Sequence, residues 1–140
     1  MRRIFADTFY WTALIHKEDE YHDLAKAMPK QLAPLIIVTT QMVLAEFLNY
    51  FGNQQRAYYK RFAARLVDEI LSDPETIVVD QTARQFDSAL ETYKSYADKH
   101  WSLTDCASYN VMKNEGITDA LTHDRHFEQM GFMALMRNSH

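Results

Sequence analysis

The chain has 140 residues, of which 47% are hydrophobic, and its formal net charge is −4. This is enough apolar material for a core, so we expect one domain over residues 1–140. A single cysteine excludes an internal disulfide framework and favours a reducing, cytoplasmic setting, and no apolar run approaches the roughly 20 residues of a membrane span. The negative charge argues against a protein that coats nucleic acid through bulk positive potential, although a metal ion can reverse the sign of an acidic site.

In the first half of the chain, short apolar runs alternate with amphipathic stretches. The predicted elements are a strand at 3–6, a helix at 9–16 capped by Asp7 or Thr8, a helix at 19–28, a loop bracketed by Pro29 and Pro34, a strand at 35–38, and a helix that begins at Thr39 or Thr40 and ends at Gly52-Asn53. In that last helix, apolar residues recur at three- and four-residue spacing, which predicts one buried face.

The second half continues the same alternation. Its predicted elements are a helix at 54–71 with Phe62, Leu66, Ile70 and Leu71 on its buried side, a strand at 76–79, a helix from Thr82 to about Tyr96, a helix from Ser102 or Thr104 to Lys113 that stops at Gly116, a strand at 119–122, a helical turn at 126–130 and a strand at 132–136. Strands that alternate with helices predict an α/β fold with a mainly parallel sheet covered on both faces. Active sites of such folds gather at the carboxyl ends of the strands.

Four acidic residues lie at the edges of these elements: Asp7, Glu46, Asp105 and Asp124. A carboxylate beside an apolar run is an awkward place for a charge, because burying it unpaired is costly. If the fold brings the four together, they repel one another until a cation neutralises them. Hard oxygen ligands suit Mg²⁺ or Mn²⁺, and metal-dependent cleavage of phosphodiesters is a reaction that such a cluster serves.

Each acid also has a purely structural interpretation. Asp7 can cap a helix, Glu46 can flank an amphipathic helix, and Asp105 can be a first-turn residue stabilised by the helix dipole. Asp119 lies close enough in sequence to replace Asp124.

Several further residues invite either a functional or a structural reading. His126 and Phe127 suggest acid chemistry, but we expect Phe127 in the core and His126 packed or hydrogen-bonded near the site. His123 and Arg125 can touch substrate phosphate or lie in a solvated loop, and Cys106, without a partner cysteine, is expected to be a small buried residue.

Two stretches combine basic and aromatic residues. The stretch 54–65 suits an RNA face, a dimer or partner surface, or an ordinary amphipathic helix, and these three alternatives stay open. Lys99, His100 and Trp101 form a second candidate patch just before Ser102.

Four motifs in this order carry a resemblance to a known family. They are Asp7-Thr8 after the first strand, Glu46 on the helix after the second, Ser102-Leu103-Thr104-Asp105, and Thr122-x-Asp124-x-His126-Phe127. Together they resemble a PIN-domain ribonuclease, and within that superfamily the VapC-type toxins of bacterial toxin–antitoxin modules and their stand-alone relatives. The match runs from about Arg3 to Met136.

The resemblance implies an α/β/α sandwich and a metal-dependent endonuclease that cuts single-stranded RNA. It makes Asp7, Glu46, Asp105 and Asp124 the quartet that binds one or two Mg²⁺ or Mn²⁺ ions. Thr8, Thr104, His126 and Arg125 would then orient ligand carboxylates or contact substrate. Relatives of this kind often form homodimers, and toxin members are silenced by an antitoxin protein.

Two other functions remain compatible with the same residues. One is a PIN-like RNA- or protein-binding module without catalysis, against which the intact acidic set argues. The other is a stand-alone RNA-processing nuclease that has no antitoxin. Phosphatases of the haloacid-dehalogenase type are disfavoured, because they want a second Asp where this chain has Phe9.

Overall fold

The computed structural model describes residues 1–52 and 57–137 as a five-stranded sheet between two layers of helices. The strands are β1 (Arg2–Ala6), β2 (Leu35–Thr40), β3 (Thr76–Val79), β4 (Asp119–Leu121) and β5 (Met133–Ala134). The helices are α1 (Thr8–Ile15), α2 (His22–Leu32), α3 (Gln41–Gly52), α4 (Ala57–Ser72), α5 (Ala83–Ser95), α6 (Leu103–Glu115) and α7 (His126–Gln129).

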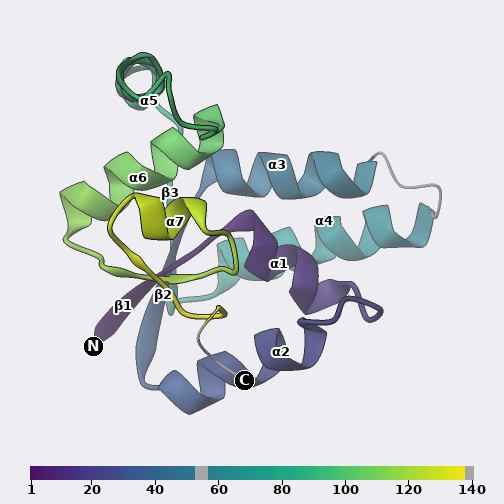
Figure 1. Ribbon diagram of the computed structural model, residues 1–140. Coiled ribbons are helices and arrows are strands. Elements are labelled where there is room, and N and C mark those ends of the chain that lie inside the picture. The colour runs from purple at the N-terminus through teal and green to yellow at the C-terminus, as the bar shows by residue number, and fades with distance from the viewer. Residues whose placement is uncertain (53–56, 138–140) are drawn as a thin grey trace.

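The sheet has the strand order β3-β2-β1-β4-β5, and every pair of neighbouring strands is parallel. Figure 1 shows α1, α2 and α4 on one side of it and α6 and α7 on the other, with α5 outside α6. The chain winds outward from β1 to β3 and then returns past β1 to β4, so the crossover helices change sides. The predicted α/β class and three-layer arrangement are confirmed.

The core lies on both faces of the central strands. Phe5 and Phe127 contact each other on one side, with ring centroids 6.2 Å apart, and Phe47 and Phe51 of α3 are fully or almost fully buried. Among the described residues, no helix is long and apolar enough to cross a membrane.

Several element boundaries differ from the prediction. The second helix begins at His22 rather than near Asp19 and runs through Pro29 to Leu32, so Pro29 does not open a loop. A proline there removes one backbone donor from a helix that is otherwise intact. The second strand extends to Thr40, and the last one shrinks to Met133–Ala134.

The buried face of α4 also differs. Phe62 and Leu71 are 43% and 60% exposed, whereas Tyr59, Ala63 and Ile70 are buried. The inner stripe of the helix therefore runs through the smaller Ala63, and the larger apolar residues flank it. The predicted helix start at Gln54 and the cap residue Asn53 lie outside the described residues.

Candidate active site

Asp7 follows directly after β1, where the strand turns into α1. Its backbone is the N-cap of α1, but its side chain makes no capping hydrogen bond. The side chain is 5% exposed, and its Oδ2 accepts a hydrogen bond from the Thr122 hydroxyl at 3.0 Å. The carboxylate is therefore held by the loop that follows β4.

Asp105 lies in the first turn of α6. The Ser102 hydroxyl accepts a hydrogen bond from the Asp105 amide, and the Asp105 Oδ2 accepts one from the Ser102 amide, both at 3.0 Å. This reciprocal capping box fixes the carboxylate at the helix N-terminus, where the dipole favours negative charge. The Asp105 side chain can therefore cap α6 and also act as a metal ligand.

Asp124 and His126 come from the connection between β4 and α7. The Asp124 amide donates to the Thr122 hydroxyl at 3.0 Å, and the His126 amide donates to Asp124 Oδ1 at 2.9 Å. The ring Nδ1 of His126 lies 3.1 Å from Asp105 Oδ2 and 3.3 Å from Asp124 Oδ1. One ligand atom from each of Asp105, Asp124 and His126 lies within 4.8 Å of the others, a spacing that allows a shared metal ion.

The electrostatics of the acids reflect their burial. Burial, reinforced by the negative charge of Asp105, raises the pKa of Asp7 to about 7. Burial is also the main cause that raises the pKa of Asp105, with a further contribution from Asp124. The hydrogen bonds from Thr122 and Ser102 oppose these shifts but do not cancel them. A nearby cation would stabilise the charged form of both carboxylates.

All four predicted acids border one open pocket of about 460 Å³. Glu46 reaches it from α3; its side chain is exposed and makes no hydrogen bond or ion pair within residues 1–52 and 57–137. The Thr8 hydroxyl is buried beside Asp7 and has no hydrogen-bond partner in the described part of the chain. Buried hydroxyls normally have a hydrogen-bond partner, which a water molecule or a ligand beside the acids would supply.

Other predicted residues lie farther from the pocket. Thr104 is buried and does not line it, although its carbonyl accepts a hydrogen bond from the Ser108 hydroxyl. Arg125 is exposed and also outside the lining. Asp119 forms an ion pair with Arg2 at the start of β4, so it does not replace Asp124.

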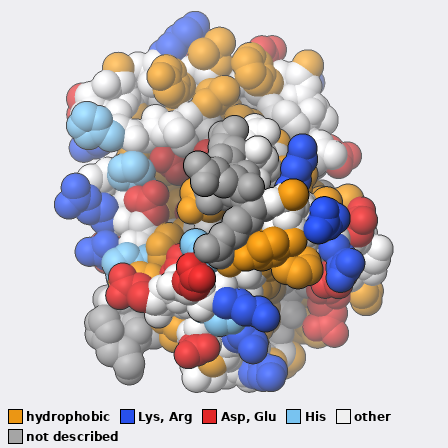
Figure 2. Space-filling view, turned by 90° about the vertical axis from the view of Figure 1, so that its right-hand side faces the viewer, with side chains coloured by type: hydrophobic (Ala, Val, Ile, Leu, Met, Phe, Trp, Pro, Cys, Tyr) orange, Lys and Arg blue, Asp and Glu red, His pale blue; other side chains and the backbone are white. Residues whose placement is uncertain are grey.

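Structural expectations for two apolar residues are confirmed, because Phe127 is fully buried and Cys106 is 1% exposed. Figure 2 shows basic and apolar side chains side by side over α4, where Tyr58 and Phe62 are partly exposed. This is the described portion of the predicted 54–65 face; Gln54 and Arg56 lie outside the described residues.

Two further residues contribute to the site: Thr122, which the sequence offered only as part of the Asp124 motif, and His123, which was expected to touch phosphate or to lie in a solvated loop. Thr122 joins two acids, since its hydroxyl donates to Asp7 and accepts from the amide of Asp124. His123 lines the pocket and shares a 3.0 Å hydrogen bond with the Tyr21 hydroxyl, while its ring stacks near Phe9. Thr122 could have been found from its place at the end of a strand beside Asp124, but Tyr21 is 102 residues away from His123.

Comparisons with known proteins agree with this geometry. No protein-family profile matches the sequence. The chain is 29% identical over 132 residues to the 23S rRNA-specific endonuclease VapC20 of Mycobacterium tuberculosis, from strains CDC 1551 / Oshkosh and ATCC 25618 / H37Rv, covering 93% of this chain and 95% of the relative. The resemblance to the VapC-type PIN-domain proteins is confirmed. A crystal structure of M. tuberculosis VapC20, described as a toxin that cleaves the sarcin-ricin loop, matches with a TM-score of 0.82 and 26% identity, over 94% of this chain and 98% of that one. The VapC-type fold thus extends over nearly the whole chain.

Proposed function

We propose that this VapC-type protein is a metal-dependent endoribonuclease and the toxin of a toxin–antitoxin pair. The observation that carries the proposal is the convergence of Asp105, Asp124 and His126 within 4.8 Å, beside buried Asp7. The similarity to an rRNA-specific endonuclease supports the same reaction class.

The residues present fit a divalent cation. Asp7 and Asp105 are buried carboxylates with raised pKa values, and a positive ion would relieve the repulsion between them. The unpaired Thr8 hydroxyl offers a further oxygen at the same place. A set dominated by hard oxygen donors suits Mg²⁺ or Mn²⁺. When bound, such an ion supplies neutralisation of the phosphodiester charge and activation of water.

In this proposal Asp7, Glu46, Asp105 and Asp124 hold the metal. His126 contacts two of these carboxylates and is positioned either to join them as a ligand or to orient them. The Thr122 hydroxyl is a positioning group, because it fixes Asp7 and the loop that carries Asp124.

The proposed substrate is RNA, and ribosomal RNA is the class that the relative's name suggests. We also propose a cytoplasmic location, a cognate antitoxin protein and a homodimer. The buried free thiol of Cys106 agrees with a reducing compartment.

The first test is cleavage of a mixed RNA pool by the purified protein with Mg²⁺, Mn²⁺ or EDTA. The wild type should cut only with metal. Asp7→Asn should lose more than the roughly 10- to 100-fold that removing a residue behind a metal ligand costs. Asp87→Asn, which removes an exposed carboxylate on α5, should cut like the wild type. Full activity of folded Asp7→Asn would refute the site, and absence of cutting under every condition would favour a binding module.

A further inference from the structure

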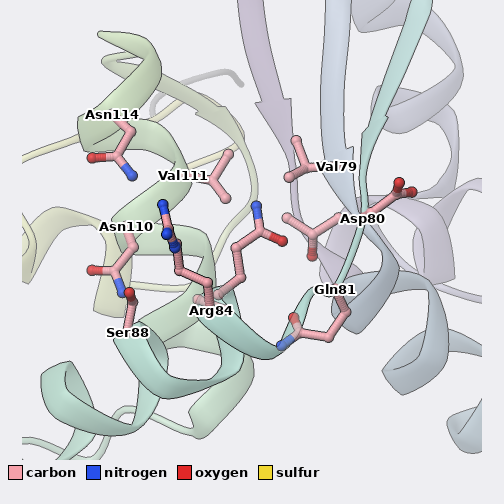
Figure 3. A pocket seen from close by; sticks show the side chains of 11 residues that line it. Val79, Asp80, Gln81, Arg84, Ser88, Asn110, Val111 and Asn114 are labelled. Carbon is pink, nitrogen blue, oxygen red and sulfur yellow. The ribbon is translucent and has the colours of Figure 1, made fainter.

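A second pocket lies between α5, α6 and the ends of β2 and β3. Its volume is about 240 Å³, and none of its lining residues belongs to the acidic pocket. Figure 3 shows Arg84 of α5 reaching toward Asn110 and Asn114 of α6, with Val79 and Val111 at its back. The proposed cleavage reaction uses none of these residues.

Two amide side chains of this pocket, those of Gln85 and Asn110, have their oxygen atoms engaged. The Oε1 of Gln85 accepts a hydrogen bond from the Thr82 amide at 3.2 Å, which leaves its NH₂ group free. The Oδ1 of Asn110 accepts from the Thr92 hydroxyl at 2.9 Å. Because these two amides are held through their oxygens, their NH₂ groups are left to donate to a ligand, whereas Gln81 uses its NH₂ group to donate to the Thr82 carbonyl.

Arg84 adds the strongest donor. Its guanidinium forms no hydrogen bond or ion pair with any residue that the structure describes. Figure 3 shows the amide nitrogen of Asn114 turned toward the Arg84 guanidinium and that of Asn110 turned toward Ser88. The pocket therefore collects several donors and calls for a ligand with adjacent acceptor atoms.

The rest of the lining argues for a flat, largely uncharged ligand. Val79, Val111 and Ala107 supply apolar surface, and Arg84 is the one cationic residue of the lining, with Asp80 also at its border. A phosphate site would be expected to gather more positive charge. A nucleobase combines an apolar face with acceptors on its edge, and unpaired bases of RNA are read in this way.

We propose that this pocket binds one unpaired base of the RNA substrate, with a preference for guanine. Guanine presents the neighbouring acceptors O6 and N7, which a guanidinium can contact with two hydrogen bonds. Adenine presents N7 beside an amino group, and that amino group would face donors. This inference rests on the proposed ribonuclease function, because it names the part of the substrate that reaches the pocket.

The sheet register places the pocket close to the acids. Phe5 of β1 pairs with Val38, two residues before Thr40 as Phe5 is two residues before Asp7, and Thr40 pairs with Val79. Thr40 and Val79 both line the pocket. With neighbouring strands about 4.8 Å apart, the backbone of the pocket wall begins about one strand spacing from Asp7. A base near the cleaved phosphate is therefore the part of the substrate within reach.

The test uses the ¹⁵N-labelled full chain in EDTA, titrated with guanosine monophosphate, adenosine monophosphate or inorganic phosphate. The side-chain amide signals of Gln85, Asn110 and Asn114 should shift with the guanine nucleotide, at least about tenfold more tightly than with the adenine nucleotide. Arg84→Ala should weaken this binding at least about tenfold. Lys94→Ala removes a positive charge from the same helix outside the pocket and should change nothing.

Equal shifts with inorganic phosphate would make the pocket an anion site and overturn the proposal, as would equal affinity for adenine or no shift at all. Melting temperatures of both variants show whether they fold. The titration contains no metal and cleaves nothing, so a negative result here does not contradict the nuclease proposal. If RNA is not cleaved in the separate assay, the nucleotide-binding result can still be interpreted. In mapped cuts from the RNA pool, guanine should be enriched beside the cleaved bonds for the wild type and Lys94→Ala, and this enrichment should fall for Arg84→Ala.

Discussion

The two pockets of this protein differ in how they hold their polar groups. The acidic pocket buries Asp7 and Asp105 within reach of each other's charge, and both pKa values are raised. The α5–α6 pocket keeps Arg84 exposed and adds neutral amides, of which Gln85 and Asn110 are anchored through their oxygen atoms. The first arrangement opposes folding until a cation arrives, whereas the second is compatible with a stable free protein. The acidic pocket therefore lowers the stability of the metal-free protein, whereas the α5–α6 pocket does not.

The largest expected effect comes from separating the two roles of Asp105. Both Asp105→Asn and Asp105→Ala should lower RNA cleavage by about a thousandfold or more, because each removes a charged ligand whose supporting contacts alone account for 10- to 100-fold. Their stabilities should differ, since Asn can still accept the Ser102 amide and Ala cannot. We expect Asp105→Ala to be less stable than Asp105→Asn by about 1 kcal/mol in urea unfolding.

Comparing the two Asp105 variants separates the cost of losing the charge from the cost of losing the cap. Equal stability of the two variants would show that the capping box contributes nothing measurable. Cleavage by folded Asp105→Asn at the wild-type rate would remove Asp105 from the catalytic set.

The next effect is a pH dependence of the metal-free protein. Asp7 has a folded pKa of about 7 against an ordinary value of 3.8, so between these values the folded chain binds a proton that the unfolded chain does not. In EDTA, the free energy of unfolding should therefore rise as the pH falls from about 7 toward 4, by a few kcal/mol at most, at about 1.4 kcal/mol per pKa unit.

Asp7→Asn removes this titration. The difference in stability between Asp7→Asn and the wild type should be largest above pH 7, in favour of the variant, and should shrink as the pH falls. Asp87→Asn provides the comparison, because it removes the same charge from an exposed position. A constant difference from pH 4 to 8 for Asp7→Asn would contradict the burial of its charge.

The smallest of these effects belongs to His126. Its ring contacts Asp105 and Asp124, so His126→Ala should weaken Mn²⁺ binding, measured calorimetrically, by about 10- to 100-fold. His100→Ala, at an exposed position, is the matched control. Unchanged Mn²⁺ affinity in His126→Ala would mean that the histidine only packs between the carboxylates.

Local sequence patterns carried most of the fold. The strand at Thr76–Val79 follows from an apolar run and is confirmed, and of the two starts considered for α6, Ser102 is the cap. The errors arose where tertiary packing overrides propensity. In α4, the sheet and α3 accept Ala63 in place of the larger Phe62, a choice that periodicity alone does not reveal.

Three of the candidate acids were identifiable because Asp7 and Asp124 follow strands and Asp105 opens a helix, and parallel strands bring such positions to one edge, whereas Glu46 lies in the middle of α3. The contacts among the acids were not identifiable, since the hydrogen bond between Thr122 and Asp7 joins residues 115 positions apart. The α5–α6 pocket was also missed. Its donors become a set only when α5 packs on α6, and no motif marks that arrangement in the sequence.

One carboxylate oxygen of Asp105 takes part both in the cap of α6 and in the candidate metal site. Its Oδ2 accepts the Ser102 amide and also lies 3.1 Å from the ring of His126. The oxygen atom that caps the first turn of α6 thus also contacts His126, in the connection between β4 and α7. A substitution at Asp105 therefore affects both the start of α6 and the placing of His126.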